Sequence, residues 1–312
     1  MLSEVIQALL PTVLVVALGA LARHLRWFSE KADEGIMQLV VNLFYPALLF
    51  SFILGNPLLK SFSLVLVPVF LGFLSILIGF VVALLMTRGM TRYTQVDRRT
   101  FAFSTGIYNF GYLPIPITLA LFGSEAVGVL LVFNAGVDLA IWSVGIILIS
   151  GNLGREWKQK LFNAPFLALI TALLLNGFHI DEHLPRFVFD TVGMVGACAI
   201  PLGLLLSGGV MYDLLKRSSL FRDPVIPFYG CLHRLVLVPS LFVVAAVLIP
   251  LQHPLPQILV VQAAMPAGLF TIVLARHYGG NPKISLQVIA WTAALSLITL
   301  PAWLLIGLRW VQ

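Results

Sequence analysis

Ten apolar stretches fill most of this 312-residue chain, and this pattern restricts its fold more than any other feature. A helix that crosses a bilayer needs about 20 mainly apolar residues, and lipid accepts only helices or closed barrels, because every backbone hydrogen bond must be made internally. Hydrophobic residues make up 60% of the chain and charged residues 10%, which is far from the balance of a soluble domain. We therefore expect an all-α polytopic membrane protein with ten transmembrane helices. The expected bounds are roughly 5–22, 35–55, 62–87, 101–122, 126–150, 163–178, 187–212, 224–250, 255–275 and 284–308.

Basic residues gather on one side of this expected bundle. The loops after the first, third, fifth, seventh and ninth stretches hold fifteen of the nineteen Lys and Arg residues. Because cytoplasmic loops carry such an excess, we expect a multi-pass protein of the plasma (inner) membrane with both termini outside the cytoplasm. The same distribution accounts for the net charge of +6, so the lipid bilayer is an expected partner and nucleic acid is not.

The chain carries no motif of an enzyme. It contains no HExxH, P-loop, GxSxG or paired-carboxylate pattern, each of which places reactive groups at a fixed spacing. Cys198 and Cys231 lie in apolar stretches and lack the spacing of a disulfide framework or a metal site. We therefore expect no catalytic residue, no cofactor and no metal ligand, while the coupling ion of a transporter, H⁺ or Na⁺, stays open.

Prolines recur at a nearly constant offset in the two halves of the chain. The matched pairs Pro11 and Pro165, Pro46 and Pro201, Pro68 and Pro224, and Pro116 and Pro266 are 154, 155, 156 and 150 residues apart. This offset predicts an internal repeat. Five helices per repeat is an odd number, so the second repeat enters the membrane from the opposite side. We expect a first repeat over 1–149, a short basic cytoplasmic linker over 150–162, and an inverted second repeat over 163–312.

Two apolar stretches, Ser104–Gly123 and Val260–Ala275, are interrupted by proline and glycine at corresponding places in the two repeats. Proline removes a backbone donor and clashes with the preceding turn, and glycine permits tight backbone geometry. The residues expected at the two breaks are Asn109, Gly111, Pro114, Pro116, Pro266 and Gly268.

Helices broken at membrane depth in both repeats are typical of a substrate site. Irregular backbone at that depth is tolerated only where it is buried in protein or lines a polar cavity. Each half-helix that follows a break starts with a partial positive charge, and inversion brings the two starts together near the midplane. This geometry favours an anion without requiring Lys or Arg. In the structural alternative, each proline merely kinks a packed helix.

Four further polar residues lie within apolar stretches. Asp138 and Arg234 are expected near the same depth, either as a buried ion pair that locks the fifth and eighth helices or as groups for binding or coupling. Asn134 lies one turn before Asp138 and is a further candidate ligand. Gln262 lies one turn before Pro266, where it either lines the cavity or bonds to a neighbouring helix.

Several of these strings resemble one transporter family. Residues 109–117, NFGYLPIPI, resemble the N-x-G-x-x-x-x-P signature of the fourth helix in the auxin efflux carrier family, and residues 265–281, MPAGLFTIVLARHYGGN, resemble its ninth. The strings VNLFYPALLFSFI from Val41, AIPLGLLLSGGVM from Ala199, RLVLVPSL from Arg234 and LSLITLPAWL from Leu295 are also similar to that family. The resemblance spans essentially the whole chain. The short central loop is typical of bacterial members.

The resemblance implies a particular architecture and mechanism. Helices 1, 2, 6 and 7 would form a scaffold that makes a homodimer, and helices 3–5 and 8–10 a mobile transport domain. The broken helices 4 and 9 would cross at prolines that correspond to Pro116 and Pro266, beside Asn109. Substrates would be organic anions, such as indole-3-acetate in plants or small carboxylates like malate or malonate in bacteria, carried by an elevator-type alternating-access mechanism.

This chain departs from the family pattern at two positions. Pro114 stands where many members have Gly, and Phe270 stands where many have Asn. The second change removes a polar group from the ninth-helix break, so hydrogen bonding to the substrate differs from the family pattern. We therefore expect a transporter of small organic anions. The alternatives are a sodium-coupled anion symporter of the bile-acid type, which would bind sodium through unwound carbonyls, and a channel.

Overall fold

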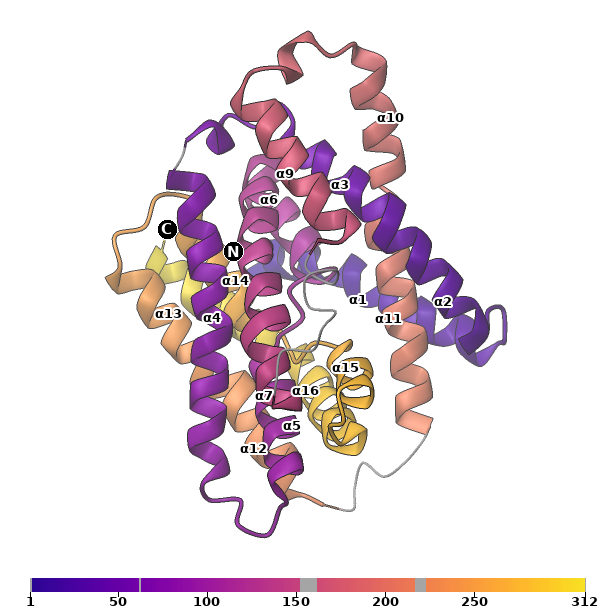
Figure 1. The fold of residues 1–312 in the computed structure, drawn as a ribbon, viewed down its shortest axis with the longest axis vertical. Coiled ribbons are helices and arrows are strands. Elements are labelled where there is room, and N and C mark those ends of the chain that lie inside the picture. The colour runs from indigo at the N-terminus through magenta and orange to yellow at the C-terminus, as the bar shows by residue number, and fades with distance from the viewer. Residues whose placement is uncertain (1, 62, 152–161, 217–222, 312) are drawn as a thin grey trace.

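The computed structural model describes residues 2–61, 63–151, 162–216 and 223–311, and every regular element in these ranges is a helix (Figure 1). Three of the long apolar helices contain a π-helical turn, named η1, η3 and η5, whereas η2 and η4 are short 3₁₀ turns. The elements in chain order are α1 Leu2–His24, α2 Glu30–Leu39, η1 Val40–Phe44, α3 Tyr45–Ile53, η2 Leu58–Lys60, α4 Ser63–Thr87, α5 Gln95–Gly106, α6 Pro114–Ala140, η3 Ile141–Gly145, α7 Ile146–Ser150, α9 Ala164–Gly177, η4 Asp181–His183, α10 Arg186–Gly196, α11 Ala199–Lys216, α12 Val225–Leu232, η5 His233–Leu237, α13 Val238–Leu248, α14 Leu255–Ala264, α15 Thr271–His277 and α16 Pro282–Val311.

Seven helical stretches in the described ranges are long and apolar enough to cross a membrane, which confirms an all-α, multi-span protein. The seven are Ser3–His24, Glu30–Ile53, Ser63–Thr87, Pro114–Ser150, Arg186–Asp213, Val225–Leu248 and Pro282–Val311. Two shorter apolar helices, Ala164–Gly177 and Leu255–Ala264, cover the sixth expected stretch and half of the ninth. The count differs from ten because the fourth and ninth stretches are split by breaks and the sixth forms only 14 helical residues.

The helical stretch Pro114–Ser150 is kinked at Gly123. Gly123 has φ 82° and ψ −179°, a conformation that glycine adopts without the strain imposed by a side chain. The kink separates the second half of the fourth expected stretch from the fifth. Of the expected linker 150–162, residues 152–161 lie outside the described residues.

The helices pack in two groups that meet along the middle of the molecule. In one group α1 packs along α11, and α3 packs against α9 and α10. In the other group α4 packs on α5 and α6, while α16 packs on α12, α14 and α5. Figure 1 shows α2, α11 and α10 on one side and α4, α12 and α13 on the other. The second group contains both helix breaks, and α1 and α11 contact it through α6 and α16.

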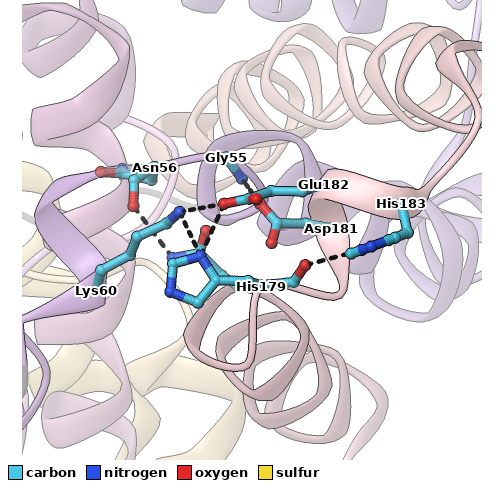
Figure 2. A network of polar contacts seen from close by, with 8 residues as sticks. Gly55, Asn56, Lys60, His179, Asp181, Glu182 and His183 are labelled. Atoms are coloured by element: carbon cyan, nitrogen blue, oxygen red, sulfur yellow. Dashed lines mark hydrogen bonds and ion pairs between the residues drawn. The ribbon is translucent and has the colours of Figure 1, made fainter.

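Two connections at one end of the molecule are held together by polar contacts (Figure 2). Lys60 Nζ, before α4, lies 2.9 Å from Glu182 Oε1, between α9 and α10, and His179 Nδ1 lies 2.7 Å from the same oxygen. Beside them, Gly55 N donates to the buried Asp181 carboxylate at 2.9 Å. The hydrogen bonds from His179 and Lys60 lower the pKa of Glu182 to about 2. The start of α4 is therefore tied to the α9–α10 connection.

Candidate functional site

The first helix break covers residues 107–113. Helix α5 ends at Gly106, and α6 begins at Pro114. Of the residues that the sequence predicted at this break, Asn109 and Gly111 lie within it, whereas Pro114 and Pro116 lie in the first turn of α6. The physical reason is that the first turn of a helix has backbone N–H groups without intrahelical partners, so proline is accepted there without losing a hydrogen bond. Both Pro114 and Pro116 therefore start a helix rather than interrupt one.

The second break covers residues 265–270. Helix α14 ends at Ala264, Pro266 lies within the break, and α15 begins at Thr271. Because α15 has only seven residues, few peptide dipoles add up along it. The helical segment after the first break is also short, since it is interrupted at Gly123, so each break is followed by a short half-helix, as the sequence predicted.

The two breaks pair directly with each other. Asn109 N donates to Pro266 O at 2.8 Å, and Gly268 N donates to Ile107 O at 2.9 Å. These bonds form an isolated antiparallel bridge between Tyr108 and Ala267. The pairing explains how non-helical backbone is accommodated inside the bundle, since each unwound segment supplies hydrogen-bond partners for backbone groups of the other. The crossing therefore lies at Tyr108 and Ala267, rather than at Pro116.

Arg234 binds three backbone carbonyl groups at the second break. Its Nε donates to Met265 O at 3.0 Å, and its Nη2 lies 3.0 Å from Ala263 O and 3.4 Å from Gln262 O. The guanidinium is fully buried, and its Cζ lies 4.9 Å from the centre of the Tyr108 ring. A cation at the carboxyl end of α14 is favoured by the helix dipole, so Arg234 stabilises the end of this half-helix.

The ion pair between Asp138 and Arg234, one of the two alternatives that the sequence left open, does not form. The ion pairs among the described residues do not include it, because the Arg234 guanidinium is directed at the end of α14. Arg234 lies in the π turn η5, and such a turn changes the direction of the side chains around a helix. Asp138 lies on α6 close to Tyr45 instead.

Asn134 and Gln262 join the two broken helices. Gln262 Nε2 donates to Asn134 Oδ1 at 2.8 Å, and Asn134 Nδ2 donates to Phe110 O, in the first break, at 2.8 Å. Both side chains are almost fully buried. These two candidate ligands therefore bond to the protein and fix the position of the first break relative to α14.

A cavity of about 320 Å³ opens beside the crossing. Asn109 and Pro266 are the two predicted site residues that line it. The Asn109 side chain is half-buried, and its amide makes no hydrogen bond to another residue in the described part of the chain. The remaining lining residues are neutral and mostly apolar: Ile6, Leu9, Leu10, Val13, Val16, Leu113, Leu204, Ser207, Met211, Ala267, Leu269, Ala293, Ser296, Leu297, Leu300 and Pro301.

The walls of the cavity come from both groups of helices. Helices α1 and α11 contribute one side, and the crossing with α16 contributes the other. The hydroxyls of Ser207 and Ser296 each donate to a backbone carbonyl of their own helix at 2.7 Å. Asn109 is therefore the lining side chain best placed to bind a polar ligand.

Comparison with known protein families shows what kind of protein contains this cavity. The model of the membrane transport protein family matches residues 4–159 and, again, residues 153–304. The chain belongs to this family, which includes the auxin efflux carriers. Two successive matches to one family model indicate an internal repeat. The chain is thus a multi-pass membrane transporter and not an enzyme.

Two relatives of this transporter cover nearly its full length. An uncharacterized transporter from Methanothermobacter thermautotrophicus is 25% identical over 301 residues, which are 95% of this chain and 96% of the relative. Auxin efflux carrier component 8 from Arabidopsis thaliana is 23% identical over 341 residues, which are 90% of this chain and 91% of that carrier.

The other predicted site residues of this transporter lie outside the cavity lining. They are Gly111, Pro114, Pro116, Asn134, Asp138, Arg234, Gln262 and Gly268. Three residues that the sequence did not single out support the crossing: Ser75 Oγ lies 2.7 Å from Tyr108 OH, and Thr292 Oγ1 accepts from Ala267 N at 3.2 Å. Tyr108 could have been found from its place directly before Asn109, whereas Ser75 and Thr292 lie in apolar helices without any local signal.

Proposed function

We propose that this transporter carries small organic anions through the cavity at the crossing. The observation that carries the proposal is the juxtaposition of the unoccupied Asn109 amide, the unwound backbone and the start of α6 at one cavity of about 320 Å³. Leu113, the N-cap residue of α6, lines that cavity, so the partial positive charge at the start of α6 lies beside it. No acidic side chain lines it to repel an anion.

The architecture in this proposal is a pair of inverted five-helix repeats, 1–149 and 163–312. Helices α1, α2–α3, α9 and α10–α11 form the scaffold, and α4–α7 and α12–α16 form the transport domain. The packing of the helices in two groups supports this division. Because the cavity lies between the groups, displacement of one group past the other would move the crossing across the membrane. This is an elevator-type form of alternating access.

The surroundings of the transporter complete the proposal. The excess of Lys and Arg in alternate loops supports a plasma-membrane orientation with both termini outside the cytoplasm. The family resemblance supports a homodimer formed through the scaffold helices. Anion binding at the cavity requires neither this orientation nor the homodimer.

Sodium coupling is the less favoured alternative, because Arg234 occupies the carbonyls that such a mechanism requires. A sodium ion would need free oxygen ligands in the unwound segment, but Met265 O and Ala263 O each accept from the guanidinium at 3.0 Å. A fixed cation at that place repels a second one. We therefore expect the anion site to work without sodium.

A ligand screen followed by a transport assay tests the proposed function. Purified protein is heated with a panel of mono- and dicarboxylates, with and without sodium, because a ligand that binds the folded state raises the melting temperature. We expect carboxylates to raise it without sodium, and to show saturable counterflow in proteoliposomes. A channel would conduct without counterflow.

Two asparagine variants locate the site in the same assays. Asn109→Ala should lose the ligand-induced shift and the counterflow while keeping the melting temperature of the unliganded protein. The matched control is Asn42→Ala, since Asn42 is exposed on η1 and bonds only to Gln38 O, at 2.9 Å. Failure of every anion to bind, or equal behaviour of the two variants, would contradict the proposal.

A further inference from the structure

Asp138 is a carboxyl group without a partner inside an apolar helical stretch. It lies in Pro114–Ser150 and is half-buried. No hydrogen bond or ion pair joins its side chain to another residue in the described part of the chain. By contrast, Asp33 pairs with Arg23, and Asp223 pairs with Arg92. An unpaired carboxylate at membrane depth is costly, and protonation removes the charge that causes the cost.

The groups around Asp138 supply no compensating cation. Tyr45, the first residue of α3, lies near Asp138, and its ring lies 6.3 Å from the ring of Tyr112 in an edge-on arrangement. Of the elements packed against α6, helices α4 and α14 and the turn η3 contain no charged residue, and Tyr45 is the one titratable residue of α3. The turn η2 carries Lys60, which pairs with Glu182, and α6 itself carries Glu125, directly after its kink. The charged residues of α1, Glu4 and Arg23, lie towards its two ends.

Asp138 also lies where the two groups of helices meet. Tyr45 belongs to the group of α1 and α11, whereas Asp138 and Tyr112 belong to the group that contains the crossing. Tyr112 directly precedes Leu113, which lines the cavity. Asn134, one turn before Asp138, donates to Phe110 O in the first break. A change of charge on Asp138 therefore acts both on the boundary between the groups and on the neighbouring anion cavity.

We propose that Asp138 binds the proton that couples anion transport to a proton gradient, with the proton and the anion moving in the same direction. The inference rests on the proposed function of the cavity. A proton binds one carboxylate oxygen on one side of the membrane and leaves it on the other, so no other reactant is needed. A negative Asp138 repels the incoming anion, and a neutral one does not. Because coupling between two binding sites is reciprocal, the bound anion strengthens proton binding to the same degree.

Calorimetry on the purified full-length protein tests this coupling with indole-3-acetate and oxalate as probes. Between about pH 6 and about pH 8 both probes are ionised, so a pH dependence of binding comes from the protein. We expect wild-type affinity to rise as the pH falls, by at most about tenfold per pH unit for one proton. Titrations in two buffers with different ionisation enthalpies should show proton uptake on binding.

Three variants assign that proton. Asp138→Asn should bind the probe with the same affinity at every pH and take up no proton, whereas Asp138→Glu should still take one up. The control is Asp190→Asn, since Asp190 is exposed on α10, and it should keep the wild-type profile. Persistent proton uptake by a folded Asp138→Asn overturns this inference and leaves the anion site intact.

An infrared titration separates failure of this inference from failure of the proposed function. If the wild type binds no probe, the anion site is contradicted. The infrared carboxyl stretch can still be measured without any ligand, and it then reports on the protonation of Asp138. A protonated-carboxyl band that titrates in the wild type, moves in Asp138→Glu and disappears in Asp138→Asn supports the proton site. A spectrum without such a band overturns it.

Discussion

Replacing Gly268 by alanine tests whether the two breaks depend on direct backbone contact. A Cβ at Gly268 would lie 3.0 Å from Tyr108 O and 3.3 Å from Tyr108 C. Carbon and carbonyl oxygen normally approach to about 3.3–3.6 Å, so the two segments would have to separate by about 0.3–0.6 Å. That movement lengthens the 2.9 Å bond from Gly268 N to Ile107 O. Overpacking of this kind costs about 1–3 kcal/mol of unfolding free energy.

Gly111 provides the matched control within the same crossing. A Cβ at Gly111 meets nothing within 4 Å, and the φ angle of Gly111 lies outside the left-handed region. Alanine there removes conformational freedom from the unfolded chain, which stabilises a protein by about 0.4–1 kcal/mol. Gly268→Ala should therefore be less stable than Gly111→Ala by about 1.5–4 kcal/mol.

Reversible denaturation in mixed micelles, followed by tryptophan fluorescence, measures this difference. Counterflow in proteoliposomes measures its consequence, because a displaced crossing moves Asn109 relative to the cavity. We expect Gly268→Ala to lose stability and transport, and Gly111→Ala to keep both. Equal stability and equal transport in the two variants would refute the direct contact between the breaks.

Three further predictions address other parts of the molecule. Arg234→Met should lower the unfolding free energy by about 3 kcal/mol, because the carbonyls of Ala263 and Met265 lose their donor at about 1–3 kcal/mol each while the cost of burying a charge is relieved. An unchanged unfolding free energy, measured by chemical denaturation, would show that these bonds do not stabilise the fold. Gly111→Cys, in a chain with Cys198 and Cys231 replaced, should react with impermeant thiol reagents from both sides of the membrane, and substrate should alter the ratio of labelling from the two sides. Reaction from one side under all conditions would contradict alternating access. Glu182→Gln should melt below the wild type at neutral pH, and this difference should vanish as the pH falls from about 4.5 towards about 2. The pKa of Glu182 is about 2 in the folded protein against an ordinary 4.5, so its carboxylate stabilises the fold only while it stays ionised. A difference in melting temperature that persists in acid would argue against the Lys60 and His179 contacts.

The sequence predicts well the features that depend on local composition. The apolar stretches, and the presence of breaks near Pro114 and Pro266, follow from backbone chemistry that each segment carries by itself. Asn109 and Gly111 lie in the first break as expected, but the crossing that the family resemblance placed at Pro116 lies at Tyr108, because a proline can start a helix as readily as it can interrupt one. Pro114 and Pro116 occur in the first turn of α6, and only the partner segment decides where the backbone unwinds.

Contacts around a helix were harder to predict than positions along it. Asp138 and Arg234 share an expected depth, but an ion pair also requires that both side chains face each other, and the π turn at Arg234 alters that direction. The cavity walls from α1, α11 and α16 were not predicted either, since apolar residues that face a cavity, a neighbouring helix or lipid look alike in a sequence. Asn109 was found because it is the polar residue beside a break.

The isosteric change Asn109→Asp tests the anion site most directly. It keeps the volume of the side chain, and the Asn109 amide makes no hydrogen bond to the described chain that the change would break. It places a negative charge at the cavity, which repels an anion. Equilibrium binding of the best carboxylate from the screen should be lost in Asn109→Asp, at an unchanged melting temperature of the unliganded protein. Wild-type affinity in the folded variant would contradict an anion site at the crossing.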